Sequence, residues 1–183
     1  MENISDNKIN NYNQRVVINN VLVGIVVVAV AVLSYFILSS NIKSTLYVHK
    51  RFLELFYNMD FTFVPGVGYT EIGGNFIITE SCSGAKLFVS AFLIASLGFG
   101  IRIRDKKEKI VFLIKAYIFT LLGALIISIF RIIISLPVLT MENAQLAHNI
   151  ISLICYFGSL ACLYLVLQVH FEKRETENNY EKH

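Results

Sequence analysis

Four long apolar runs constrain the fold of this chain more than any other feature. They cover residues 21–38, 87–101, 110–136 and 149–169. A helix needs roughly 20 apolar residues to cross a hydrocarbon core of about 30 Å, and the second run reaches this length when residues 83–86 are added. Helices and closed barrels are the structures that satisfy their own backbone hydrogen bonds in lipid. The sequence therefore predicts an all-α integral membrane protein, a bundle of four transmembrane helices.

The composition also indicates that the chain is surrounded by a lipid bilayer. Of its 183 residues 55% are hydrophobic and only 16% are charged, whereas a soluble domain carries about 25% charged residues. The net charge is only +3. No basic patch with stacking aromatic side chains is evident, and nucleic-acid binding would require one. We expect the bilayer as a partner and no nucleic acid.

The first apolar run allows two interpretations, a cleaved signal peptide or a retained anchor. Residues 21–38 are longer than a usual signal-peptide core, and Ser39-Ser40-Asn41 lacks the small-x-small cleavage pattern. We therefore expect a retained anchor. The predicted organisation is a disordered cytoplasmic tail at residues 1–15, one membrane domain at residues 16–172 and a second cytoplasmic tail at residues 173–183.

The basic residues predict the orientation. Short loops rich in Lys and Arg stay on the cytoplasmic side. The loop at residues 102–109 is of this kind, whereas the loop at residues 137–147 has no Lys or Arg and carries Glu142. We expect a multi-pass protein of the cell membrane with both termini in the cytoplasm and residues 39–81 outside. The basic residues of the loop at 102–109 are Arg102, Arg104, Lys106, Lys107 and Lys109. Three basic residues on the predicted outer side weaken this asymmetry, namely Lys43, Lys50 and Arg51.

The predicted outer loop contains structure of its own. Residues 46–59 alternate apolar and charged side chains in a pattern typical of an amphipathic helix that lies on a membrane surface. Turns are predicted at Pro65-Gly66-Val67-Gly68 and at Gly73-Gly74, followed by an extended segment at residues 75–79. The loop thus leads in a defined way to the start of the second helix.

Cys82 is the strongest candidate for chemistry in the sequence. It lies in Glu80-Ser81-Cys82-Ser83-Gly84-Ala85-Lys86, at the predicted start of the second helix. The positive end of a helix dipole favours thiolate over thiol. The alternative is a small apolar residue at a helix start, because buried free cysteines are common. That alternative suits the other two cysteines, Cys155 and Cys162, which lie deep in the fourth run; no CxxC redox motif is present.

Arg131 and His148 are expected in the same outer layer as Cys82. Arg131 lies about five residues inside the outer end of the third helix, roughly 8 Å down, and His148 opens the fourth helix from outside. A charge within a bilayer costs roughly 2.5–3.5 kcal/mol or more and usually points to a partner in the bundle, although snorkelling toward the interface is the alternative. One Cys and one His beside a cation do not make a metal site. We expect neither a metal nor a cofactor.

These three residue types together indicate cysteine-nucleophile chemistry. His148 can take the proton of Cys82, and the thiolate can attack a peptide carbonyl while Arg131 stabilises the oxyanion. Glu80 and Lys86 are candidate contacts to these residues or to the substrate. No Asp is clearly placed to orient His148. The alternative is a non-catalytic membrane assembly factor or small-solute carrier, in which the three residues serve packing and topology.

The order of these residues resembles the exosortase/archaeosortase family, in its compact exosortase K type. The resemblance rests on Cys82-Ser83-Gly84 followed by Lys86, on Arg131 in a later apolar helix and on His148 opening the next, and it covers residues 68–154. It implies a membrane-embedded cysteine transpeptidase or protease with membrane-anchored protein substrates. These carry a C-terminal sorting signal made of a short motif, a transmembrane helix and a basic tail.

By this resemblance Cys82 is the nucleophile, Arg131 the transition-state stabiliser and His148 the acid and base. Two departures stand out. Larger family members have more membrane spans. Lys86 stands where an Arg is usual, and a lysine lacks the bidentate fork of a guanidinium.

Overall fold

The computed structural model describes residues 2–73, 76–103, 105–137 and 144–180. The expectations for residues 74–75, Arg104 and Glu142 fall outside the described residues. The elements in chain order are α1 (Glu2–Ser40), α2 (Ile42–Tyr57), β1 (Phe61–Val64), β2 (Gly68–Glu71), β3 (Ile77–Ile78), the 3₁₀ turn η1 (Glu80–Cys82), α3 (Ala85–Gly98), the 3₁₀ turn η2 (Gly100–Arg102), α4 (Lys106–Ser135) and α5 (Ala144–Tyr180).

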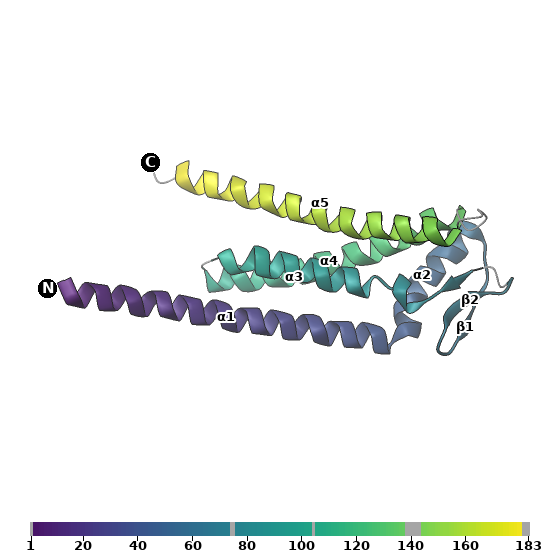
Figure 1. Ribbon diagram of the computed structural model, residues 1–183, viewed down its shortest axis with the longest axis horizontal. Coiled ribbons are helices and arrows are strands. Elements are labelled where there is room, and N and C mark those ends of the chain that lie inside the picture. Colours follow the sequence, from purple (N-terminus) through teal and green to yellow (C-terminus); the bar gives the residue numbers. More distant parts are fainter. Residues whose placement is uncertain (1, 74–75, 104, 138–143, 181–183) are drawn as a thin grey trace.

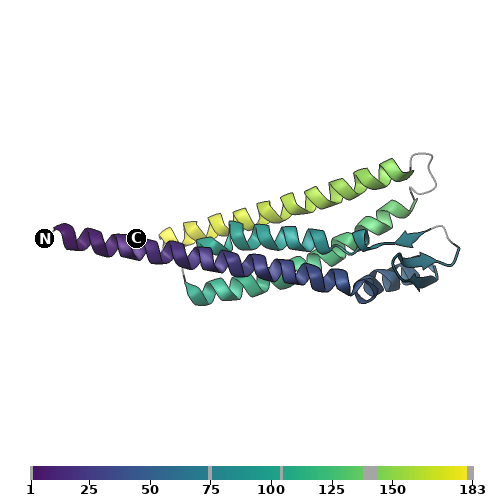
Figure 2. The ribbon, with the colours of Figure 1, turned by 60° about the horizontal axis from the view of Figure 1, so that its bottom comes forward.

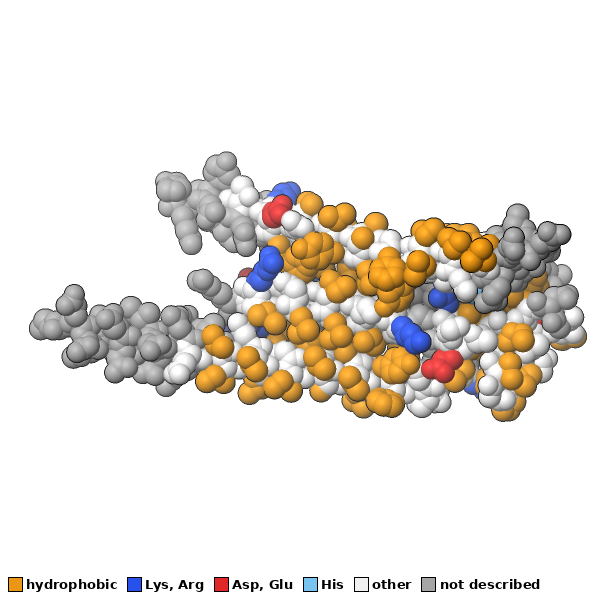
Figure 3. Space-filling model, viewed as in Figure 1, with side chains coloured by type: hydrophobic (Ala, Val, Ile, Leu, Met, Phe, Trp, Pro, Cys, Tyr) orange, Lys and Arg blue, Asp and Glu red, His pale blue; other side chains and the backbone are white. Residues whose placement is uncertain are grey.

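Four helical segments are long and apolar enough to cross a membrane, as predicted. They are Val17–Ser40, Glu80–Arg102, Lys106–Ser135 and Leu146–Lys173. Figure 1 shows α1 and α5 flanking α3 and α4, with both chain termini at one end of the bundle and α2 with the strands at the other, the sheet end. Apolar side chains cover much of the length of the bundle (Figure 3), as expected for helices that face lipid.

Helix α3 is the central element of the bundle and contacts α1, α4 and α5. An aromatic cluster fixes it against α4, where the Tyr117 ring meets Phe88 at 5.2 Å and Phe92 at 5.4 Å between centroids. The Tyr117 hydroxyl also lies 3.1 Å from the Ser34 hydroxyl of α1. The half-buried tyrosine thus keeps its polar end paired while its ring packs against the core.

The start of α4 is capped at the end of the bundle where the chain termini lie. The Asp105 side chain accepts a hydrogen bond from the Glu108 backbone N–H at 3.0 Å, which satisfies one free donor of the first turn. One residue on, the buried Lys109 donates to the Asn20 amide oxygen of α1 at 2.9 Å. These bonds join α4 to α1 at this end.

A three-stranded antiparallel sheet in the order β1-β2-β3 covers the other end of the bundle. Residues 65–67 form the turn between β1 and β2 at the predicted Pro-Gly-rich segment. Gly68 has φ +128°, and a Cβ there would collide with the Ile78 carbonyl of β3, so glycine lets the strands approach closely. Part of the extended segment expected at residues 75–79 is confirmed as β3, whereas the three-stranded sheet was not predicted and makes the fold more than all-α.

Helix α2 contains the predicted amphipathic segment, and one side of it is covered by protein, whereas Phe52, Leu55 and Phe56 are exposed. Leu46, His49 and Leu53 are its buried residues, spaced as one face of a helix. Leu46 and Leu53 belong to a core cluster with residues of the sheet and of α4. The helix therefore packs between the sheet and the bundle, and this packing holds the sheet above α4.

Helical backbone extends into both segments predicted as tails. Helix α1 begins at Glu2, and α5 runs to Tyr180. The limits of the membrane domain at residues 16 and 172 stay predictions. The first membrane span begins at Val17, and the fourth ends at Lys173.

Candidate active site

The loop that carries Cys82 is fixed by its glycine. Gly84 lies just before α3 with φ +74°, and a Cβ there would be 2.9 Å from the Ala124 carbonyl oxygen and 3.1 Å from Ser128 Oγ of α4. Only glycine takes this backbone conformation without strain. The Ser83 hydroxyl accepts a hydrogen bond from the Ala85 N–H at 3.3 Å. The tripeptide Cys82-Ser83-Gly84 thus brings the loop into close contact with α4.

Cys82 itself ends the 3₁₀ turn and does not begin the helix. Helix α3 starts at Ala85, three residues after Cys82, while the second membrane span begins at Glu80 and therefore contains Cys82 near its end, as expected. Its side chain is only 6% exposed and belongs to an apolar cluster that includes Phe76, Ile78 and Ile132. The structure therefore places the thiol in the core between the sheet and α4. This position agrees with the alternative stated above, in which Cys82 is a small, buried apolar residue.

Arg131 joins α4 to the Cys82 loop. Its Nη2 donates a hydrogen bond to the Ser81 carbonyl oxygen at 2.7 Å. Its Nε is buried and has no hydrogen-bond partner among the described residues. The guanidinium therefore has a partner, the backbone next to the proposed nucleophile, and the hydrogen bond between them is exposed.

His148 lies near the start of α5, close enough to Arg131 for their charges to interact. Its Nδ1 is buried and has no hydrogen-bond partner in the described part of the chain. The structure thus brings Arg131 close to both His148 and the backbone of the Cys82 loop. Among the described residues, the Cys82 side chain packs in the apolar cluster and is not a hydrogen-bond partner of the His148 Nδ1.

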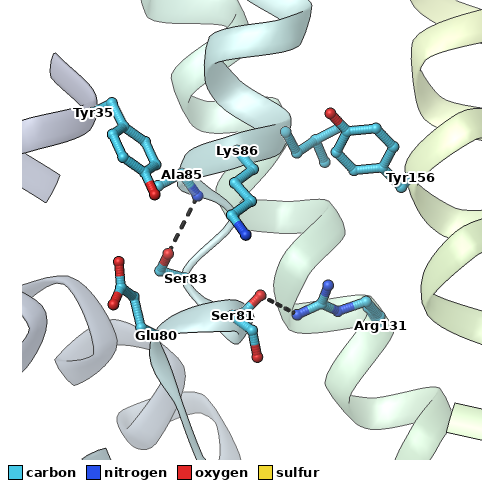
Figure 4. A pocket seen from close by; sticks show the side chains of 10 residues that line it. Tyr35, Glu80, Ser81, Ser83, Ala85, Lys86, Arg131 and Tyr156 are labelled. Carbon is cyan, nitrogen blue, oxygen red and sulfur yellow. Dashed lines mark hydrogen bonds between the residues drawn. The ribbon is translucent and has the colours of Figure 1, made fainter. Parts of the chain in front are cut away.

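A cavity of about 360 Å³ lies beside the loop. Its lining includes the two candidate contacts, Glu80 and Lys86, together with Arg131 and the serines on either side of Cys82. Figure 4 shows the Lys86 side chain reaching toward Ser81, with Arg131 on the same side and Glu80 on the other side of Ser83. Tyr35 of α1 and Tyr156 of α5 complete its walls. The cavity contains two cations and one carboxylate, so its side chains favour an anionic group or a developing negative charge.

His49 also lies close to this site, a position that the sequence did not predict. It is 1% exposed, its Nε2 lies 2.6 Å from Ser128 Oγ, and its Nδ1 lies 3.3 Å from the Thr45 carbonyl oxygen. Burial lowers the pKa of His49 to about 4, and the nearby Arg131 charge acts in the same direction. The imidazole is therefore neutral at pH 7.

The neutral state of His49 fixes its hydrogen bonds. The Thr45 carbonyl can only accept, so Nδ1 carries the proton and Nε2 accepts from the Ser128 hydroxyl. The Leu125 carbonyl, 2.8 Å from Ser128 Oγ, is the competing acceptor for that hydroxyl. The spacing of His49 from Leu46 and Leu53 was the available sequence signal, since it places the histidine on the apolar face of α2.

No grouping of three or more His, Cys, Asp or Glu side chains suited to a metal ion occurs in the part of the chain that the structure describes. Cys155 and Cys162 are unpaired thiols on α5, half-buried and exposed respectively. They are seven residues apart within the span, as expected from the sequence. No family model, curated protein or solved structure matches this chain.

Proposed function

We propose that this membrane protein is a cysteine transpeptidase or protease that cleaves the C-terminal sorting signals of exported proteins. The observation that carries the proposal is the 2.7 Å hydrogen bond from Arg131 to the carbonyl of Ser81. It holds an intramembrane cation against the residue before Cys82, at the wall of a polar cavity. In this proposal both termini are cytoplasmic and the cavity opens on the extracytoplasmic side.

The proposed reaction follows from the chemistry of the three residues. His148 takes the Cys82 proton, and the sulfur attacks the substrate carbonyl carbon. The oxyanion that forms is stabilised by the Arg131 guanidinium, whose Nε has no other partner. The C–N bond then breaks, the amine leaves with the proton held by His148, and a thioester remains on Cys82. Water, an amine or a hydroxyl group completes the reaction by releasing the acyl group from sulfur.

This mechanism requires a movement of the loop at residues 79–84. Cys82 is 6% exposed in the apolar cluster at rest, so its side chain has to turn from the cluster toward the cavity lined by Ser81 and Ser83. We propose that substrate binding in the cavity drives this turn. A signal with one apolar helix suits the site, because the cavity lies between membrane-spanning helices.

The burial of Cys82 favours a second candidate, a non-catalytic membrane assembly factor or small-solute carrier. In that function the thiol fills the core beneath the sheet, and Arg131 fixes the loop through Ser81. The cavity of about 360 Å³ then binds a partner or a small anionic solute. The two candidates differ in whether Cys82 forms a covalent bond.

Processing of a co-expressed substrate separates them. The substrate is a tagged exported protein that ends in a short motif, one apolar helix and a Lys/Arg tail, and an immunoblot follows its cleavage. We expect no cleavage with Cys82→Ala, a rate lower by about 100-fold with Arg131→Gln, because one oxyanion donor is lost, and unchanged cleavage with Cys162→Ala. Unchanged cleavage with Cys82→Ala would refute the mechanism.

A further inference from the structure

A second, apolar groove lies between α3 and α5, farther along α3 than the polar cavity. The groove has a volume of about 710 Å³, and its lining includes Leu93 and Leu97 of α3 and Leu160 and Tyr164 of α5. Gly98 and Ala161, two small residues, also line it. In the most apolar part of α5 no residue is buried. The groove therefore opens to the surroundings of the bundle.

Helical spacing places lining residues of the cavity and of the groove on the same faces of α3 and α5, which we call the seam. Leu93 and Leu97 follow Lys86 by seven and eleven residues, so the three residues lie on one face of α3. Tyr156 lies four residues before Leu160, on one face of α5. Between the two regions the Tyr156 and Ser90 hydroxyls lie 2.6 Å apart and join the helices.

The charges that line the cavity favour an anion. No Asp or Glu among the described residues lies within ion-pair distance of the Lys86 ammonium or the Arg131 guanidinium. Both cations line the cavity, and Glu80 is the one carboxylate there. Lys86 and Arg131 lie on one side of the loop and Glu80 on the other (Figure 4). A compact group with one negative charge therefore balances the site.

We infer that this seam binds an anionic phospholipid, with its phosphate at Lys86 and Arg131 and an acyl chain in the groove between α3 and α5. The dimensions fit such a molecule. From Lys86 to Leu97 the helix rises roughly 16 Å at 1.5 Å per residue, close to half of a hydrocarbon core of about 30 Å. Tyr35 and Tyr156 lie at the cavity wall, and tyrosines favour the headgroup level of a membrane.

Lipid binding in this seam uses the cavity of the proposed substrate but requires no step at Cys82, so it can be measured separately from the reaction. Native mass spectrometry of the full chain in detergent, titrated with phosphatidylglycerol, measures it directly. We expect Lys86→Gln to weaken binding by about fivefold, as a basic side chain near a lipid phosphate contributes about 1 kcal/mol. Lys86→Arg should retain binding, and Lys43→Gln, an exposed cation of α2, should not change it.

The groove is tested by a matched pair on α5. Ala161→Phe fills the groove and should weaken binding of the lipid, whereas Cys162→Phe, at an exposed position that is not a lining residue, should not. Diacylglycerol, which lacks the phosphate, should bind weakly and without dependence on Lys86. Inorganic phosphate should compete poorly, because it leaves the groove empty.

Four outcomes would overturn the inference. Equal losses in Lys86→Gln and Lys43→Gln would show general surface attraction. Efficient competition by inorganic phosphate with no effect of Ala161→Phe would show a site for free anions. Failure of Lys86→Arg to retain binding in a protein of unchanged helix content would remove the charge argument. Occupation of the seam by an acidic single-span peptide, with the same dependence on Lys86 and Ala161 and no lipid binding, would show a peptide site instead.

Discussion

At the scale of single residues, the Cys82-Ser83-Gly84 loop combines a demanding backbone with a buried thiol. Gly84 meets α4 at backbone and side-chain atoms, and Arg131 holds the Ser81 carbonyl from the same helix. The loop is thus fixed on both sides of Cys82. The side chain of Cys82 points into an apolar cluster, so its reactivity depends on how often the loop opens.

Replacement of Gly84 by alanine should be strongly destabilising. The new Cβ would meet Ala124 and Ser128 within about 3 Å at a φ of +74°, and such a change costs about 2 kcal/mol or more. Chemical denaturation of the detergent-solubilised protein, followed by circular dichroism, measures the free energy of unfolding. Gly158→Ala is the matched control, because nothing lies within 4 Å of its Cβ position. Equal stability of the two variants would contradict the close contact.

The Cys82 thiol should react slowly in the resting protein. Burial at 6% exposure limits access, so labelling by a maleimide should be at least about tenfold slower than in the SDS-denatured chain. The measurement uses a Cys155→Ala, Cys162→Ala background. Phe76→Ala, which opens the apolar cluster, should accelerate labelling. Fast labelling at pH 6 without this change would instead indicate an exposed thiolate.

At the scale of elements, α2 is attached to the bundle by a buried polar contact. The His49 imidazole binds Ser128 of α4, one turn before Arg131. Because α2 also packs against the sheet, this bond connects the sheet end to the helix that carries Arg131. The protonation state of His49 should therefore affect how firmly the sheet end is attached.

The stability of the fold should decrease as the pH falls from about 6.5 to about 4. The pKa of His49 is lowered from 6.5 to about 4 in the folded chain, so the unfolded chain takes up a proton first. The stabilisation is complete above the unfolded pKa and is lost as the pH falls toward the folded one, by roughly 3 kcal/mol in total. Denaturation at a series of pH values measures the change.

The matched variants assign this pH dependence to one residue. His49→Gln should remove most of the slope between pH 6.5 and pH 4, while the exposed His170 of α5 serves as the control position, where His170→Gln should preserve it. An identical slope in both variants would mean that carboxylates, not His49, determine the acid sensitivity.

The sequence predicted the elements of the bundle better than the sheet end. Apolar runs identify spans because length and composition alone determine whether a helix can cross lipid. β1 and β3, with four and two residues, are too short for a clear alternating pattern. The contact of Arg131 with the Cys82 loop followed from the cost of an unpaired charge, but the direction of the Cys82 side chain depends on packing with Phe76 and Ile132, which no local pattern reveals.

At the scale of the whole molecule, the bundle has a polar end and an open seam. The span Glu80–Arg102, which contains α3, is the most buried of the four, and half of the residues in its most apolar part are buried. The span of α5 is the least buried, because none of the residues in its most apolar part is buried. The two termini of the chain lie at the end of the bundle opposite the sheet (Figure 2). The cavity lies beside η1 and the start of α3, near the sheet end, so under the proposed function the orientation of this end in the membrane decides which substrates can reach it.

We predict that the sheet end lies outside the cell. Cysteines introduced singly into a cysteine-free background test this with an impermeant maleimide. Val67→Cys, at the exposed turn between β1 and β2, should be labelled in intact cells. Lys107→Cys, in the basic segment at the opposite end, should be labelled only after permeabilisation, because short basic loops remain cytoplasmic. The reverse pattern would place the cavity in the cytoplasm, where exported substrates are out of reach, and would exclude the proposed sorting function whatever the reactivity of Cys82.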